Sequence, residues 1–257
     1  MAEVRRDEDV LEDEFDQLAG WTAGIIERLD LADPVPAACN GSGSPASLGW
    51  LVDRMRLDSR SLVLDTGAGL GGPAAWLART SGATLVTSEP MRGAALGSRR
   101  LFGTPGVVAW SHQLPFGSGR FAGALALAVL STVADKEAYL AEVRRVLAPG
   151  GRLGLLDYVR TGGPLVDPPV NNEFLQPDQL DRILAASGFE IEGRAMASDL
   201  PAAPDEWTTV SDRVSRAVAA AHPGASAVVR AGEQQQRFAR LLSAGSLGIR
   251  LVTAVRP

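Results

Sequence analysis

Cysteine is nearly absent from this chain, since Cys39 is the single one among 257 residues. One thiol cannot close an internal disulfide, and two histidines are too few to build a Cys/His cluster around a metal ion. The sequence therefore predicts no metal site and a reducing, cytoplasmic environment. Long apolar runs are also missing. The longest, residues 121–130, is only half of the roughly 20 residues that a membrane-crossing helix needs, so we expect no membrane span.

The chain also lacks an excess of basic residues. The chain has 25 Lys and Arg against 30 Asp and Glu, which gives a net charge of −5. Nucleic-acid binding requires a basic surface, so we expect no nucleic-acid partner. The acidity is concentrated in residues 1–16, which carry −6, while the remaining residues sum to +1. Such a leader is typical of a solvated, poorly ordered tail in front of a near-neutral body.

What the chain does contain is a regular alternation of apolar strands and amphipathic helices. Apolar residues make up 46% of the composition, which suits a globular domain with a substantial core. The alternation predicts a doubly wound α/β fold, in which a mostly parallel sheet is covered by helices on both faces. The expected strands are residues 61–65, 83–88, 106–110, 121–130, 152–158, 189–194 and 249–255.

Two regions interrupt or precede this alternation. Residues 1–57 are expected to form N-terminal helices, one of them started by Ser44 as N-cap and Pro45 in the first turn. Residues 198–246 predict two further helices divided at His222-Pro223-Gly224. We therefore predict that residues 58–197 form the α/β core and that residues 247–257 supply its last strand.

The most informative local feature is a glycine-rich turn between a strand and a helix. Asp65 ends the strand, and Gly67, Gly69 and Gly72 follow it. These glycines fit the dinucleotide pattern, which keeps a nicotinamide-dependent dehydrogenase as an alternative. However, the Asp65 carboxylate would repel a pyrophosphate and attract an ammonium group. Glu89 ends the next strand, where an acid can accept hydrogen bonds from both ribose hydroxyls. The pair favours S-adenosylmethionine.

With these residues the sequence resembles the class I S-adenosylmethionine-dependent methyltransferases, over roughly residues 48–195. Asp65-x-Gly67-x-Gly69 resembles the first motif of that family, and Glu89 the second. Leu114-Pro115-Phe116 and Ala148-Pro149-Gly150-Gly151 resemble its segments before strands four and five. The stretch after Gly69 is closest to the branch that acts on small molecules, such as quinone precursors and sterols. The resemblance implies a seven-stranded sheet whose last strand is antiparallel.

The resemblance also implies a set of cofactor-binding residues: Asp65, Thr66, Gly67, Ala68, Gly69, Glu89, Pro90, Met91, Trp110, Ser111, His112 and Ala128. The chain departs from the family at Trp110, where an Asp usually contacts the adenine, and at Ala122, where another Asp is usual. We therefore expect Trp110 to pack on the adenine while Ser111 or His112 supplies a polar contact. Because of these departures, a regulatory protein that binds S-adenosylmethionine or S-adenosylhomocysteine without catalysis remains the alternative interpretation.

Candidates for catalysis are fewer. His112 is a possible general base because its unperturbed pKa is near neutral, but it also fits an adenine-pocket or plain loop residue. Tyr158 follows Asp157 at the carboxyl end of strand five, where α/β sheets place ligand contacts. Asp157 itself either contacts substrate or caps the sheet edge.

The acceptor side is expected to be apolar. In the sheet order of the family, residues 198–246 leave and re-enter at the ligand edge, which makes them a candidate substrate lid. Trp21, Tyr158 and Trp207 are the substrate-contacting candidates, and they predict a small, largely apolar acceptor methylated by in-line displacement. The alternative is that these helices only pack on the domain edge or form a dimer contact.

Overall fold

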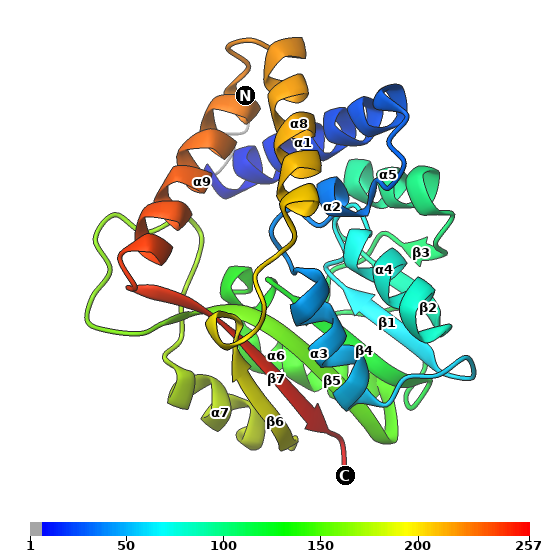
Figure 1. The fold of residues 1–257 in the computed structure, drawn as a ribbon. Coiled ribbons are helices and arrows are strands. Elements are labelled where there is room, and N and C mark those ends of the chain that lie inside the picture. Colours follow the sequence, from blue (N-terminus) through cyan, green and yellow to red (C-terminus); the bar gives the residue numbers. More distant parts are fainter. Residues whose placement is uncertain (1–6) are drawn as a thin grey trace, which may run out of the picture.

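A seven-stranded sheet runs through the computed structural model, which describes residues 7–257 (Figure 1). The spatial order is β3-β2-β1-β4-β5-β7-β6, and β7 is antiparallel to both of its neighbours, β5 and β6. The other neighbouring strands pair in parallel. This confirms the predicted α/β fold. The strands are β1 Leu62–Thr66, β2 Thr84–Ser88, β3 Gly106–Val107, β4 Phe121–Leu127, β5 Leu147–Arg160, β6 Glu190–Met196 and β7 Leu247–Val255.

Helices cover both faces of the sheet and one of its edges. They are α1 Asp7–Leu29, α2 Val35–Ala38, α3 Pro45–Met55, α4 Gly72–Ser81, α5 Arg92–Phe102, α6 Lys136–Val146, α7 Pro177–Ala186, α8 Asp205–Ala221 and α9 Ser226–Ser243, with 3-10 turns η1 Leu130–Thr132 and η2 Ala197–Asp199. Ser44 caps α3 by accepting a hydrogen bond from Ser47 N, and Pro45 occupies the first turn, as predicted. No helix within residues 7–257 is long and apolar enough to cross a membrane.

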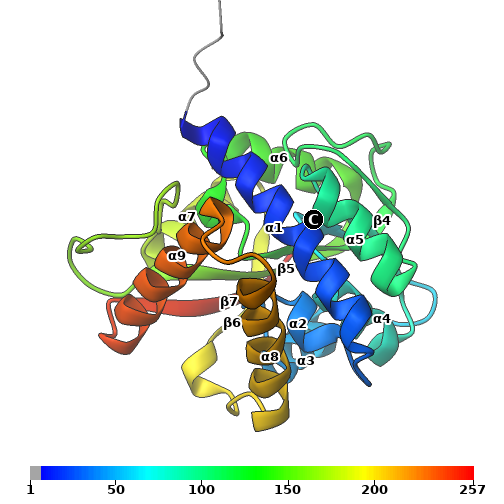
Figure 2. The same cartoon turned by 90° about the horizontal axis from the view of Figure 1, so that it is seen from above.

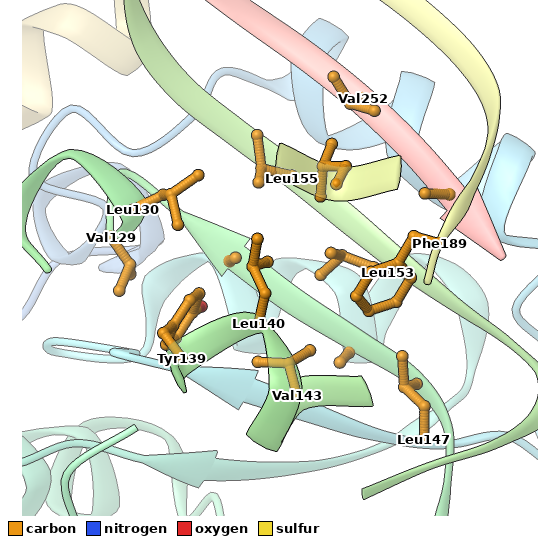
Figure 3. Close-up of a cluster of buried hydrophobic side chains, with 14 of the residues drawn as sticks. Val129, Leu130, Tyr139, Leu140, Val143, Leu147, Leu153, Leu155, Phe189 and Val252 are labelled. Carbon is orange, nitrogen blue, oxygen red and sulfur yellow. The ribbon is translucent and has the colours of Figure 1, made fainter. Parts of the chain in front are cut away.

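The sheet is buried on both faces, which explains the unbroken apolar runs of its central strands. On one face, α6 places Tyr139, Leu140 and Val143 against Leu153 and Leu155 of β5 (Figure 3). On the other face, α3 and α4 pack against alternate side chains of the same strands, such as Leu125 and Leu156. Two apolar layers therefore hold the strand ends in fixed positions relative to one another.

A layer of helices gathers at one end of the molecule, where α1, α8 and α9 lie together (Figures 1 and 2). Ala23 and Ile26 of α1 share a buried cluster with Val214 and Val218 of α8 and with Leu70 of the glycine-rich turn. Because β6 runs parallel to β5, the α8–α9 segment leaves the sheet at the carboxyl edge and returns there into β7. The helical layer therefore stands over the edge at which ligands of α/β proteins bind.

Two predictions about this architecture were wrong. Residues 7–16 of the acidic leader form the first turns of α1 and are not a poorly ordered tail. Two of their acids have partners elsewhere in the fold: Glu14 pairs with Arg230 at 3.1 Å, and Asp16 binds the start of α5. Residues 1–6 lie outside the described residues. The third strand is only Gly106–Val107. Beyond it Ala109 N still donates to Glu89 O at 3.3 Å, but Val108 and Trp110 are exposed.

Candidate active site

The glycine-rich turn joins β1 to α4 and is tied to the next strand, because Gly67 N donates to Ser88 O at 2.7 Å. Gly67 and Gly69 both have positive φ, 69° and 54°. A Cβ on Gly67 would lie 2.6 Å from Val129 Cγ2, so this glycine is required by packing against the turn after β4. A Cβ on Gly69 would meet nothing within 4 Å. Gly69 therefore leaves bare backbone facing open space, where a ligand can approach closely.

Asp65 lies at the carboxyl end of β1 and is 1% exposed. Its Oδ2 is buried and accepts no hydrogen bond from the described residues. Burial, together with the nearby Glu89 carboxylate, raises the pKa of Asp65 to about 8. A buried acid without a partner is costly, and a cationic group placed beside it would restore the ionised form. Asp65 is thus suited to an ammonium ligand.

Glu89 follows β2 and is held in a fixed orientation. Its Oε2 accepts from Gly69 N at 2.7 Å and its Oε1 from Met91 N at 3.0 Å. Burial raises the pKa of this carboxyl above its usual range, although both hydrogen bonds oppose the shift. Each carboxylate oxygen can accept a second hydrogen bond. The side chain is therefore preorganised to receive two hydroxyl groups next to Gly69, and Pro90 continues the turn into α5.

The segment after β3 carries the three residues predicted for the adenine end. Trp110 is 47% exposed, and its ring lies 6.1 Å from that of His112 at an interplanar angle of 27°. Ser111 is buried between them. His112 is exposed and lies close enough to Glu142 of α6 to lower the pKa of that carboxyl. Trp110 and His112 thus lie together at the surface after β3, whereas Tyr158 lies on β5, beyond β2, β1 and β4 in the sheet.

Two predicted cofactor residues have a structural role as well. Thr66 Oγ1 donates to Leu125 O at 2.7 Å and lies 2.7 Å from the Tyr139 hydroxyl, so this side chain is committed to the core. Ala128 has φ of 58° and donates its N–H to Leu156 O at 2.7 Å. A non-glycine residue in this conformation marks a strained turn, which is common beside functional sites. The Thr66 side chain and the N–H groups of Ala128 and Ala68 are therefore already engaged within the protein.

Ala122, in contrast, has no bearing on the adenine. It lies exposed at the second position of β4, at the amino edge of the sheet, whereas Asp65 and Glu89 lie at the carboxyl edge. The structure thus places Ala122 at the opposite edge of the sheet from the predicted cofactor residues.

Comparison with known proteins agrees with this geometry. Residues 64–155 match the family described as "Methyltransferase domain". The chain is 33% identical over 123 residues to methyltransferase GfsG of Streptomyces halstedii, covering 44% of this chain and 43% of that protein. It is 30% identical over 156 residues to an O-methyltransferase of Pyrenophora dematioidea, covering 55% of this chain and 58% of that protein. The chain thus spans about half of the length of these relatives.

Residues 64–155 thus resemble the methyltransferase domains that use S-adenosylmethionine. Solved structures of the same fold include complexes with S-adenosylmethionine and with S-adenosylhomocysteine. Solved structures show that the fold is shared more widely. The [4+2]-cyclase SpnF has a TM-score of 0.66 at 22% identity, covering 82% of this chain and 80% of that chain. Geranyl diphosphate C-methyltransferase from Streptomyces coelicolor A3(2) has a TM-score of 0.61 at 15% identity, covering 82% and 76%.

The carboxyl edge of the sheet is aromatic around Tyr158. The Tyr158 ring lies 4.6 Å from that of Phe238 on α9 and 6.5 Å from that of Phe174. Burial, with a smaller effect of Asp157, raises the pKa of Tyr158 to about 12, so its hydroxyl stays protonated at neutral pH. A Cβ on Gly41 would lie 3.6 Å from this hydroxyl, which therefore reaches the turn between α2 and α3.

The two predicted tryptophans belong to different helices of the covering layer. Trp21 of α1 stacks on His222 at the end of α8, with ring centroids 3.8 Å apart and an interplanar angle of 9°. Trp207 lies half-buried in the first turn of α8. The structure thus brings Trp21 to His222 and Tyr158 to Phe238.

Two residues support the site through contacts that were not predicted: Asp157, which was expected either to contact substrate or to cap the sheet edge, and Asp16, which sequence reasoning missed. Asp157 Oδ2 accepts from Ser131 N at 3.0 Å and its Oδ1 from its neighbour Tyr158 N at 2.7 Å, so it fixes the turn after β4. Burial raises the pKa of Asp157 to about 6. Asp16 of α1 binds the start of α5. No local pattern marks the contacts of Asp157 with Ser131 and of Asp16 with α5, because both join segments that are distant in sequence. Within residues 7–257, no group of three His, Cys, Asp or Glu side chains could hold a metal ion.

Proposed function

We propose that this protein transfers a methyl group from S-adenosylmethionine to a small, largely apolar acceptor. The observation that carries the proposal is the buried Asp65 carboxylate, which has an unpartnered Oδ2 and lies at the head of a turn whose Gly69 faces open space. An uncompensated buried acid favours a ligand that brings a positive charge. The family supports the same cofactor.

In this proposal the residues of the chain bind the cofactor and orient it toward the acceptor. Asp65 accepts from the ammonium group, Glu89 accepts from the ribose hydroxyls, and Trp110 packs on the adenine with Ser111 and His112 beside it. The bound cofactor supplies a methyl group on a sulfonium sulfur. Transfer by in-line displacement then requires mainly that the acceptor atom be held opposite that sulfur.

The acceptor would lie under the lid formed by residues 198–246. Tyr158 with Phe238, and Trp21 with His222, present aromatic surface at the carboxyl edge. Tyr158 keeps its proton at neutral pH and can orient an acceptor as a hydrogen-bond donor, but it is no base. This favours acceptors that ionise readily, such as phenols and enols. The O-methyltransferase names of two relatives, from Penicillium expansum and Pyrenophora dematioidea, support an oxygen acceptor.

Isothermal titration with S-adenosylhomocysteine tests the cofactor assignment, and NADH is the competing ligand. We expect S-adenosylhomocysteine to bind and NADH not to bind; the opposite result would revive the dehydrogenase. A mass-spectrometric screen with methyl-deuterated S-adenosylmethionine over phenols, quinols and lipids then tests the transfer.

A second candidate is a protein on the same fold that binds the cofactor without transferring its methyl group. It is favoured by the similarity to a structure named as a [4+2]-cyclase. Cofactor binding without deuterium transfer to any acceptor would support this candidate. For either function we infer a cytoplasmic location, from the free, buried Cys39 and the absence of disulfide partners in the sequence, and no nucleic-acid partner, from the acidic balance of charge.

A further inference from the structure

The covering helix α1 reaches the cofactor side of the sheet through Asp16. Figure 2 shows α1 lying alongside α5, and the two helices are in contact along their length. Asp16 Oδ1 accepts hydrogen bonds from Gly93 N and Ala94 N, the latter at 3.2 Å. These N–H groups belong to the first turn of α5, which has no partner within its own helix. The residue at the N-cap position of α5, Met91, has no side-chain cap of its own. Asp16 therefore caps α5 from a helix 77 residues earlier in the chain.

The same turn of α5 holds Glu89. Met91 N donates to Glu89 Oε1, and Gly93 N and Ala94 N donate to Asp16 Oδ1. The two carboxylates are therefore bound by N–H groups of the same turn at the start of α5. The two acids are close enough for Asp16 to act electrostatically on Glu89. The geometry of the Glu89 carboxylate thus depends on where the α5 turn lies, and the α5 turn is bound by α1.

Gly93 shows how closely α1 is docked at this point. A Cβ on Gly93 would lie 2.7 Å from both the backbone oxygen and Oδ1 of Asp16. No side chain fits between the two helices here, so a larger residue has to displace α1. At the other end of the same helix pair, Glu27 Oε1 and Arg100 Nε form an exposed ion pair at 2.9 Å, which offers a matched contact away from Glu89.

We propose that Asp16 is a positioning residue of the cofactor site, which by capping α5 holds the Glu89 carboxylate ready for the ribose hydroxyls and couples the docking of α1 to cofactor binding. This inference rests on the proposed function, because Glu89 is a ribose ligand only if the protein binds S-adenosylmethionine. Coupling of this kind is reciprocal: if docked α1 favours the cofactor, then the cofactor favours docked α1.

The test is isothermal titration of the full chain with S-adenosylhomocysteine, in the wild type and four variants. Asp16→Ala removes the cap, and Gly93→Ala displaces it, so we expect each to weaken binding about tenfold, as expected for loss of a helix cap. Asp16→Asn keeps an oxygen that caps about as well as Asp, and we expect affinity within about twofold of wild type. Glu27→Gln breaks the exposed pair between the same helices and should leave affinity unchanged.

Hydrogen exchange gives a second readout that a purely structural cap would not move. We expect S-adenosylhomocysteine to slow exchange of the α1 amides in the wild type and in Glu27→Gln, and to lose this effect in Asp16→Ala. Wild-type affinity in Asp16→Ala, or equal weakening in Glu27→Gln, would overturn the role of Asp16. If Asp16→Ala does not fold, Gly93→Ala and Asp16→Asn decide the question. Failure of the wild type to bind S-adenosylhomocysteine would instead overturn the proposed function and this inference with it.

Discussion

The carboxylates at the two ends of the sheet differ in whether they form ion pairs. At the β1–β2 end, Asp65 and Glu89 are buried, and neither forms an ion pair with any residue within 7–257. At the β7–β6 end, Asp181 lies between Arg250 and Arg194, at 2.9 and 2.7 Å, and Glu192 pairs with Arg152 at 2.7 Å. Both ends are parts of one continuous sheet, so the difference does not come from the fold itself.

This contrast separates carboxylates that hold the protein together from carboxylates kept for a ligand. Asp181 neutralises Arg250, whose side chain is only 12% exposed, so that pair contributes to stability where it lies. Asp65 lowers the stability of the ligand-free protein, because burial disfavours its charge and nothing within reach compensates it. Such a residue is retained at the cost of stability, which is typical of a functional site.

Among the substitutions that test this contrast, we expect the largest effect on cofactor affinity at Asp65. Asp65→Asn removes the charge but keeps the shape, so we expect affinity for S-adenosylhomocysteine to fall by about 100-fold, as when one partner of a buried charge pair is removed. The free energy of unfolding of the ligand-free protein should not fall. Titration calorimetry and urea denaturation measure the two quantities. Unchanged affinity would show that Asp65 does not bind the ammonium group.

Asp181→Asn should give the reverse result. It leaves the guanidinium of Arg250 without its carboxylate, and we expect the free energy of unfolding to fall by about 2 kcal/mol. Affinity for S-adenosylhomocysteine should stay at the wild-type value, because Asp181 lies on α7, outside the cofactor region. A loss of affinity with intact stability would contradict the division between the two ends.

Trp110→Ala tests a second contrast at the β1–β2 end of the sheet, between the exposed Trp110 ring and the buried carboxylates of Asp65 and Glu89. We expect affinity to fall by about tenfold, since stacking of a base on an aromatic side chain contributes about 1–3 kcal/mol. Trp110→Phe should retain most of the binding. Because Trp110 is half-exposed, the thermal midpoint should hardly move in either variant. Equal affinity in all three proteins would place the adenine elsewhere.

The last expected effect concerns stability alone and is its dependence on pH. The folded-state pKa of Asp65, about 8, lies above its unfolded value near 4, so the folded protein binds the extra proton between these values and loses stability as pH rises through them. Asp157, with a folded pKa of about 6, acts in the same direction below about pH 6. Urea denaturation from pH 4 to 8 should show a shallower decline in Asp65→Asn than in the wild type. Parallel curves would mean that Asp65 does not titrate in this range.

Much of the fold followed from the sequence because its strands are apolar runs bounded by glycine and proline, and its helices are amphipathic. Asp65 and Glu89 were identifiable for the same reason, since each is an acid at the carboxyl end of a buried strand, Asp65 within β1 and Glu89 directly after β2. Local patterns fix where a strand ends and therefore which residues share the carboxyl edge.

The supporting contacts could not be predicted, since they depend on which helix lies beside which turn. Asp16 caps a helix 77 residues away, and Val129 fits against Gly67 only after β4 has paired with β1. The extra turns of α1 were missed because dense negative charge resembles a solvated tail until its partners on α5 and α9 are known.

The position of β7 between β5 and β6 has a consequence for synthesis on the ribosome. β6 ends at Met196, but β7, its neighbour in the sheet, begins only at Leu247, after α8 and α9. While the chain is being translated from its N-terminus, β1 to β5 can already pair with one another, but β6 has no neighbouring strand. Until α8, α9 and β7 have emerged, β6 therefore has unpaired backbone groups that chaperones would protect.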